Sequence, residues 1–259
     1  MVKKPDAVEF LEPQGGRIAF RRIWPDAASG TPLVFLHEGL GSIAQWRDFP
    51  DALCALARRP GFVYERHGHG ASAPIREKRR ADYLHREARV LAEVLDAAGI
   101  EDCDLLGHSD GGSIALLAGA FAPHRHKRIA TMAAHVFVEK ITRAGIEAAV
   151  AAWRTTDLET RLARYHGAGT RDLFFAWADI WLSGPFAFWN IEKDLAPLTA
   201  RVLALQGAND EYGSPDQLAR IERAVSGPCE TWLVPDAAHQ PHLQARDSVL
   251  ARLASFFRV

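Results

Sequence analysis

The first candidate for a catalytic residue in this sequence is Ser109. Gly107 and Gly111 stand two positions before and after it, in a Gly-x-Ser-x-Gly pattern. A serine at the tip of a sharp strand-to-helix turn adopts strained backbone angles, so the residues two positions away must be small. A short apolar run at 104–106 precedes the turn and a helix-like run at 113–122 follows it. The pattern predicts an exposed serine nucleophile, and the alternative is an ordinary serine in a Gly-rich turn.

A serine hydroxyl becomes a good nucleophile only with a base in hydrogen-bond reach and an acid that orients that base. Of the 11 histidines, His239 lies between the last expected strand and the last expected helix. That loop would sit at the strand ends beside Ser109, so we take His239 as the base. His242 is the nearby rival, but its place fits the start of the next helix. The other interpretation of His239 is a surface-loop histidine.

The expected acid is Asp210, which ends a loop directly after a buried strand. Glu211 would replace it if the loop were shifted by one residue. Asp216 follows a proline and is better explained as a carboxylate at a helix start. Asp236 is better explained as a turn residue. The chain order serine, aspartate, histidine is the one expected with a Gly-x-Ser-x-Gly turn.

Attack on a carbonyl creates an oxyanion, which backbone N–H groups can stabilise. The N–H of Asp110 is one expected donor, because it follows the serine at a helix N-terminus. The second is expected from the loop at 37–42, after the third strand. Gly39 is the first choice, because a missing side chain lets the backbone approach substrate, and Leu40 is the second. Taken alone, this loop could also be a plain turn.

Alternating strands and helices must position these residues. Runs at 8–11 and 17–23 suit an antiparallel hairpin, and continuous apolar runs suit strands buried in a parallel sheet. The alternation predicts a doubly wound α/β sheet. The further expected strands are 32–36, 61–64, 104–106, 129–132, 202–205 and 230–234, and the expected helices are 46–58, 82–98, 113–122, 215–225 and 248–257.

The alternation stops at 135–198, where strand patterns disappear and aromatic residues accumulate. Ordinary helical packing explains most of these rings, but a helical insertion between strands also forms a lid over a site at the strand ends. We expect a helical cap at 135–198 on a core formed by 1–134 and 199–259. The residues expected to contact substrate are His37, His108, Phe137, Trp153, Trp177 and Trp181.

Composition is ordinary for a soluble globular protein, with 48% hydrophobic and 24% charged residues. A net charge of −1 gives no hint of a nucleic-acid or membrane partner, and a basic run at 76–80 is explained by a solvated loop. Cys54, Cys103 and Cys229 are widely spaced, which favours reduced thiols over disulfides or a zinc site. With no signal-peptide pattern and no apolar run near ~20 residues, we expect a cytoplasmic monomer or homodimer acting on a small molecule.

The sequence resembles the α/β-hydrolase superfamily, in the group with a small helical cap. The resemblance covers nearly the whole chain and rests on LVFLHEGLGSIAQW, ERHGHGAS, LLGHSDGGSIALL, LQGANDEYGSP and VPDAAHQPHLQ. It implies an eight-stranded, mostly parallel sheet, a triad of Ser109, Asp210 and His239, and no metal or organic cofactor. Two positions depart from the pattern: many relatives have Gly where this chain has Glu38, which leaves the oxyanion residue open by one, and Gly where it has Ala238.

The resemblance also implies a reaction class. The leading expectation is a carboxylesterase that acts through an acyl-enzyme on an ester with an apolar or aromatic part. A lactonase, thioesterase or C–C bond hydrolase would use the same three residues, and the perhydrolase activity of some relatives stays open. Serine at the turn argues against haloalkane dehalogenases and epoxide hydrolases, which place an aspartate there. A hypothesis of another class is a small-molecule receptor without turnover.

Overall fold

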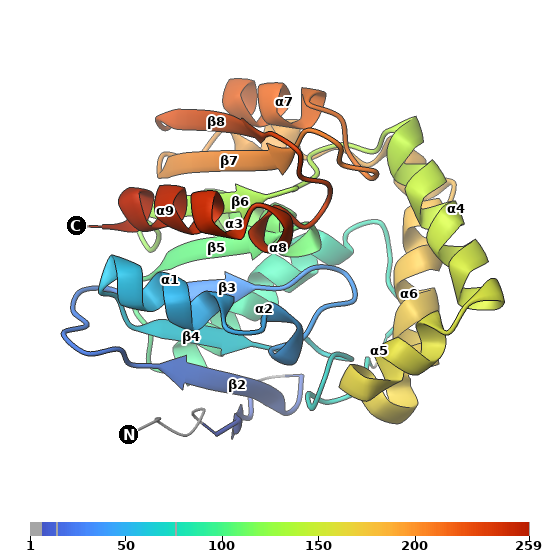
Figure 1. Ribbon diagram of the computed structural model, residues 1–259, viewed down its shortest axis with the longest axis horizontal. Coiled ribbons are helices and arrows are strands. Elements are labelled where there is room, and N and C mark those ends of the chain that lie inside the picture. The colour runs from blue at the N-terminus through green and yellow to red at the C-terminus, as the bar shows by residue number, and fades with distance from the viewer. Residues whose placement is uncertain (1–6, 14, 76, 259) are drawn as a thin grey trace.

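A sheet of eight strands forms the centre of the computed structural model, which describes residues 7–13, 15–75 and 77–258 (Figure 1). The strand order is β1-β2-β4-β3-β5-β6-β7-β8. β1 and β2 are antiparallel to their neighbours, and every pairing from β4 to β8 is parallel. The strands are β1 (Glu9–Leu11), β2 (Ile18–Ile23), β3 (Leu33–Leu36), β4 (Gly61–Tyr64), β5 (Asp104–His108), β6 (Arg128–Met132), β7 (Arg201–Gly207) and β8 (Cys229–Val234).

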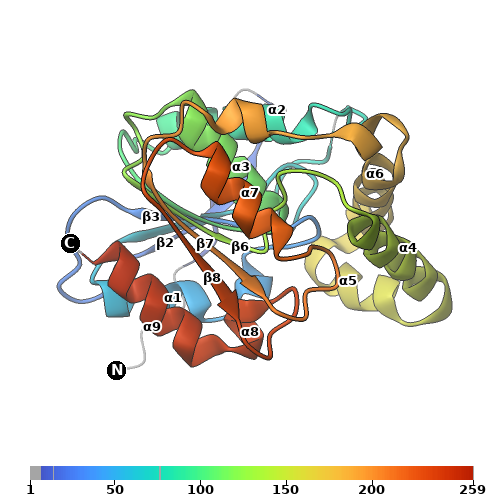
Figure 2. The same cartoon turned by 90° about the horizontal axis from the view of Figure 1, so that it is seen from above.

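Helices cover both faces of this sheet (Figure 2). On one face lie α2 (Tyr83–Ala97), α3 (Asp110–Phe121) and α7 (Asp216–Ala224), and on the other lie α1 (Phe49–Ala57) and α9 (Arg246–Phe257). The inner strands are therefore buried on both faces, which is why LVFL in β3 and GFVY in β4 are apolar throughout. The predicted fold class, a mostly parallel eight-stranded α/β-hydrolase sheet, is confirmed.

Between β6 and β7 the chain forms a separate layer of helices beside the carboxyl ends of the strands (Figures 1 and 2). It consists of α4 (Lys140–Thr155), α5 (Leu158–His166) and α6 (Thr170–Leu182), with the short helices η2 (Gly167–Gly169) and η3 (Pro185–Phe188). We call α4, α5 and α6 the cap helices. The returning chain forms η4 (Glu192–Leu195), which contacts α3 and α7 of the core.

The ends of several elements differ from those expected. The apolar run at 113–122 marks only the later part of α3, which begins at Asp110 directly after Ser109, because the first turn is rich in glycine and carries no apolar periodicity. The final helix is preceded by the short α8 (Pro241–Gln244), and η1 (Ala44–Trp46) precedes α1. No helix of the described residues is both long and apolar enough for a membrane span. Residues 1–6 and Arg76, which entered the signal-peptide and basic-run predictions, lie outside the described residues.

Candidate active site

Ser109 occupies a strained turn between β5 and α3, with φ 52° and ψ −118°. The two flanking glycines are required by space. A Cβ on Gly107 would collide with the carbonyl of Gly111, and a Cβ on Gly111 would collide with the carbonyl of Leu36. A strained non-glycine residue held by such close backbone packing is typical of functional sites.

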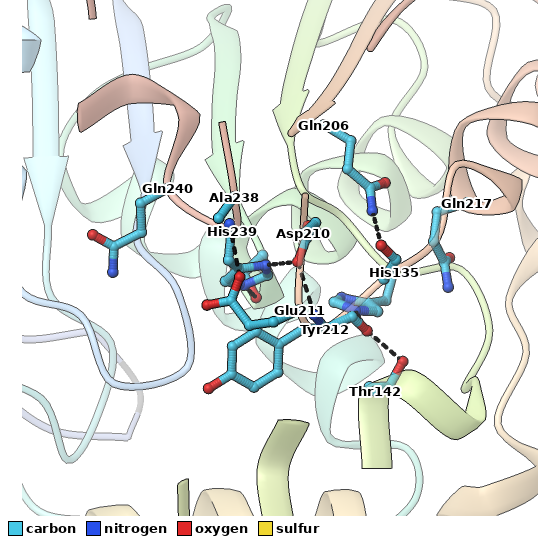
Figure 3. Close-up of polar contacts among 12 residues, drawn as sticks. His135, Thr142, Gln206, Asp210, Glu211, Tyr212, Gln217, Ala238, His239 and Gln240 are labelled. Atoms are coloured by element: carbon cyan, nitrogen blue, oxygen red, sulfur yellow. Dashed lines mark hydrogen bonds and ion pairs between the residues drawn. The ribbon is translucent and has the colours of Figure 1, made fainter. Parts of the chain in front are cut away.

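The turn brings Ser109 into a hydrogen-bonded series with His239 and Asp210. His239 Nε2 lies 2.9 Å from Ser109 Oγ, and His239 Nδ1 lies 2.8 Å from Asp210 Oδ1 (Figure 3). Because Asp210 accepts at Nδ1, this nitrogen carries the proton and Nε2 is left as the acceptor for the serine hydroxyl. The three residues follow β5, β7 and β8, whose carboxyl ends meet at one edge of the parallel sheet.

Asp210 is held in place and kept ionised. Its side chain is buried, and Oδ1 also accepts the N–H of Tyr212 at 2.9 Å. Burial alone would raise the pKa of Asp210, but the hydrogen bond and charge of His239 outweigh burial and lower it. An ionised Asp210 fixes the tautomer of His239 and would stabilise the imidazolium that forms when the serine loses its proton.

The rival acids and base have other contacts. Glu211 accepts the backbone N–H of His239 at 3.1 Å and does not reach the ring nitrogens. Asp216 is the first residue of α7 and pairs with Arg220 on that helix. Asp236 has a φ of 55° in the turn after β8, and His242 is buried in α8, as its place in the sequence predicted.

The three expected oxyanion donors line the same cavity as Ser109. In the described part of the chain, the N–H groups of Asp110, Gly39 and Leu40 donate no hydrogen bond to another residue, so all three are free for a ligand. The structure gives a different reason for glycine at 39: a Cβ there would lie 2.5 Å from Trp177 Cδ1, so the space is filled by the cap. The choice between Gly39 and Leu40 stays a prediction.

A buried guanidinium connects the two segments that carry these donors. Arg66 Nη2 donates to the carbonyl of Glu38 at 2.7 Å, and Nη1 lies 3.6 Å from Asp110 Oδ2. Tyr83 Oη donates to the same carboxylate oxygen at 3.0 Å. A buried carboxylate requires such partners, and here they fix the first residue of α3 against the loop after β3. Arg66 and Tyr83 could not be predicted from the sequence, because neither carries a local signal.

The cap helix α5 is attached to the same loop through His166. The ring of His166 donates from Nε2 to the carbonyl of Leu40 at 2.9 Å, while Nδ1 accepts the N–H of Gly70 at 3.0 Å. Burial lowers the pKa of His166, although the bond to Leu40 opposes the shift. Only the neutral ring can accept a hydrogen bond from the N–H of Gly70, so burial and this hydrogen bond both favour the neutral form of His166.

The cap and the strand ends enclose a cavity of about 250 Å³ that opens onto Ser109. Its outer wall is apolar and comes from the cap helices, whereas its inner wall is polar. The apolar residues include Ile146, Leu158, Leu162, Phe174, Trp177 and Trp181, and the polar ones include Glu38, Gln45, His135, Glu211, Tyr212 and Gln240. The described residues contain no group of three or more His, Cys, Asp or Glu side chains arranged to hold a metal ion.

Of the residues expected to contact substrate, Trp177 and Trp181 line this cavity. His37 and His108 do not, because their side chains support the loops behind it. His37 Nε2 accepts the N–H of Arg66 at 3.1 Å, and burial with the charge of Arg66 lowers the pKa of His37 to about 3. His108 Nε2 donates to the backbone carbonyl of His239 at 2.7 Å.

Phe137 and Trp153 also lie away from the cavity wall. The ring of Phe137 packs under the guanidinium of Arg220, with 3.8 Å from Cζ to the ring centroid. Trp153 stacks on Phe174, with 4.2 Å between ring centroids, so that Phe174 and not Trp153 faces the cavity. Sequence alone could not separate these rings, because the rotation of each cap helix is set by its packing.

The fold and the site can now be compared with known proteins. A family model described as alpha/beta hydrolase fold matches residues 31–160. The chain belongs to this family. Over 264 residues it is 25% identical to the dihydrolipoyllysine-residue acetyltransferase component of an acetoin cleaving system from Pseudomonas putida, covering 94% of this chain and 68% of that protein.

Two further proteins are similar to this chain, one in sequence and one in structure. The chain is 32% identical over 111 residues to a proline iminopeptidase from Heyndrickxia coagulans, which covers 41% of this chain and 35% of that protein. The structure resembles that of 2-hydroxy-6-oxo-6-phenylhexa-2,4-dienoate hydrolase from Rhodococcus sp. strain RHA1, with a TM-score of 0.80, 17% identity, and coverage of 98% and 100% of the two chains. That likeness supports the fold alone.

Proposed function

We propose that this chain is a serine hydrolase that cleaves a carboxylic ester carrying an apolar or aromatic group. The observation that carries the proposal is the unbroken hydrogen-bonded series from Ser109 through His239 to Asp210, which opens onto a cavity with free backbone N–H groups. Membership of the alpha/beta hydrolase fold family and the similarity to a proline iminopeptidase support a hydrolase. Ester specificity is our inference from the cavity.

In the proposed reaction, His239 Nε2 takes the proton of Ser109 Oγ as the oxygen attacks the ester carbonyl. The carbonyl oxygen becomes an oxyanion that accepts hydrogen bonds from the N–H of Asp110 and from that of Gly39 or Leu40. The protonated ring then gives its proton to the leaving alcohol. A water molecule, activated by the same nitrogen, hydrolyses the acyl-serine and restores the hydroxyl.

The wall of the cavity supports an apolar or aromatic substrate. Trp177, Trp181 and Phe174 offer ring surface from cap helix α6. Residues 135–198 would act as a cap on the core of 1–134 and 199–259, and the chemistry would proceed without a metal or organic cofactor. We further propose a cytoplasmic monomer or homodimer, in line with the sequence.

The test is hydrolysis of p-nitrophenyl esters, from acetate to long chains, by the wild type and by Ser109→Ala. We expect turnover that disappears in the variant, and a chain-length optimum set by the cavity. A fluorophosphonate should label the wild type and not Ser109→Ala. Labelling without ester turnover would shift the substrate to a lactone, a thioester or a C–C bond, whereas absence of both would favour a receptor without turnover.

A further inference from the structure

Glu38 places a carboxylate in the loop that carries the proposed oxyanion donors. The loop turns sharply, with the N–H of Gly41 donating to the carbonyl of Glu38 at 3.2 Å. A Cβ on Gly41 would lie 2.6 Å from Glu38 Cδ, so the carboxyl group folds back over the turn. The side chain is 23% exposed and lines both the catalytic cavity and a smaller polar cavity of about 130 Å³ beside it.

This carboxylate is ionised, and a neighbouring imidazole supports the ionised form. His108 Nδ1 lies 3.7 Å from Glu38 Oε2 and is the ion-pair partner of Glu38 among the described residues. Burial alone would raise the pKa of Glu38, but the hydrogen bond and charge of His108 lower it to about 2. A negative charge in this loop opposes the oxyanion that must form near the neighbouring N–H groups, since like charges repel strongly where water is partly excluded.

Residues around the cavity also carry buried side-chain polar atoms without a partner, which are two acceptors and one donor, Trp181 Nε1. His135 is 3% exposed, and its Nε2 donates to the carbonyl of Tyr212 at 3.0 Å, which leaves Nδ1 as an acceptor without a partner. Gln45 Oε1 is buried without a partner. Glu211 adds a second carboxylate at the rim, and Figure 3 shows Glu211 and His135 near His239.

Cations are missing from this wall. Within the described ranges, no Lys or Arg lines the catalytic cavity. Arg66 lies behind the loop, where its guanidinium pairs with Asp110 and donates hydrogen bonds to backbone carbonyls. Arg47 lines the smaller cavity only, and no ion pair joins it to Glu38 in the described chain. The two carboxylates therefore face the cavity without a cation on its wall to balance them.

We propose that the cavity selects substrates that carry an amine, bound as an ammonium group near Glu38, and that it rejects substrates with a carboxylate. A kinetic test of this inference rests on the proposed ester hydrolysis. A binding test does not, because binding can be measured without turnover. The ammonium group would donate to Glu38, and the aromatic rings of Trp177 and Trp181 would favour a cation as well as an apolar group.

The first experiment measures binding to the Ser109→Ala protein by calorimetry. The probes share one shape and differ in charge: 2-phenylethylamine, 2-phenylethanol and 3-phenylpropanoate. We expect the amine to bind at least about tenfold more tightly than the alcohol, and the carboxylate to bind most weakly. The preference should shrink as salt is raised, because the carboxylates are partly exposed. Equal binding of amine and alcohol, or tighter binding of the carboxylate, would overturn the inference.

The variants locate the effect. Glu38→Gln in the Ser109→Ala background should remove most of the preference for the amine, and Glu211→Gln, at an exposed position, should remove a smaller part. Glu101→Gln deletes one exposed carboxylate before β5, at the opposite edge of the sheet, and should leave the preference unchanged. A preference that survives both Glu38→Gln and Glu211→Gln would refute the assignment of these carboxylates.

The kinetic form uses the wild type with the methyl esters of phenylalanine and 3-phenylpropanoic acid and the monomethyl ester of benzylsuccinic acid, which keeps one free carboxylate. We expect kcat/KM to be highest for the phenylalanine ester and lowest for the benzylsuccinate ester. Turnover of all three without that order would overturn this inference and leave the proposed function intact. No turnover of any ester, with the amine still preferred in binding, would reject ester hydrolysis and retain the amine site.

Discussion

Gly39→Ala tests whether the cap and the oxyanion loop are packed against each other. The φ of Gly39 lies outside the left-handed region, so alanine can adopt its backbone conformation and keep its N–H. The added methyl group would instead meet the indole of Trp177, at 2.5 Å from Cδ1. Overpacking of this kind typically costs about 1–3 kcal/mol. If displacement of α6 relieves it, kcat/KM should fall roughly 5- to 150-fold.

The matched control is Gly184→Ala, at a cap position where a Cβ would meet nothing within 4 Å. This variant should keep the activity of the wild type. Trp177→Ala opens the space beside Gly39 and has its own effect on the cavity. In that background the additional cost of Gly39→Ala should drop to less than about twofold, because the two residues act on each other.

The assay is kcat/KM on the best p-nitrophenyl ester, supported by the rate of fluorophosphonate labelling of Ser109 and by thermal unfolding. Labelling reports the site even if the natural substrate is not an ester. An equal loss from Gly39→Ala with and without Trp177 would refute the packing argument. It would mean that the methyl group blocks substrate or disturbs the oxyanion N–H directly.

Three further predictions concern single buried side chains. Asp210→Asn should lower kcat on the order of 10⁴-fold by favouring the wrong tautomer of His239. A kcat equal to that of the wild type would contradict this role. Tyr83→Phe should lower the free energy of unfolding by about 1–3 kcal/mol in urea and slow turnover, because Asp110 loses its hydroxyl donor; unaltered stability would refute it. His126 precedes β6, and its ring donates to the carbonyl of Cys103. Burial lowers the pKa of His126 to about 4, so between about pH 4 and pH 6.5 the folded protein binds fewer protons than the unfolded chain, and stability decreases as the pH is lowered. His126→Gln should therefore reduce the slope of unfolding free energy between pH 6 and 5 by about 1.2 kcal/mol per pH unit, and an unchanged slope would count against it.

The sequence was sufficient for the sheet and for the position of the serine turn, because both follow from local constraints. A strand buried on both faces must be apolar along its length, as β3 and β4 are. A turn with Ser109 at φ 52° must have small neighbours, because a Cβ on Gly107 or Gly111 would collide with backbone carbonyl groups. The strand order then places the loops after β5, β7 and β8 together.

The sequence was insufficient for the cavity wall, because contacts between distant segments decide it. Trp153 and Trp177 both lie on cap helices, but the stacking of Trp153 on Phe174 turns it away from the cavity. His108 was expected to contact substrate. At a sharp turn neighbouring side chains diverge, and His108 instead supports the backbone of His239.

The loop after β3 shows how the same contacts couple the cap to the proposed chemistry. Its successive carbonyls are each held by a different distant residue: that of Glu38 by Arg66, that of Gly39 by His69, and that of Leu40 by His166 of the cap. The middle residue, Gly39, is packed against Trp177. The orientation of the loop's N–H groups is therefore fixed from both the core and the cap. A substitution in α5 or α6 that reshapes the cavity should also move the oxyanion donors, so kcat and KM should change together.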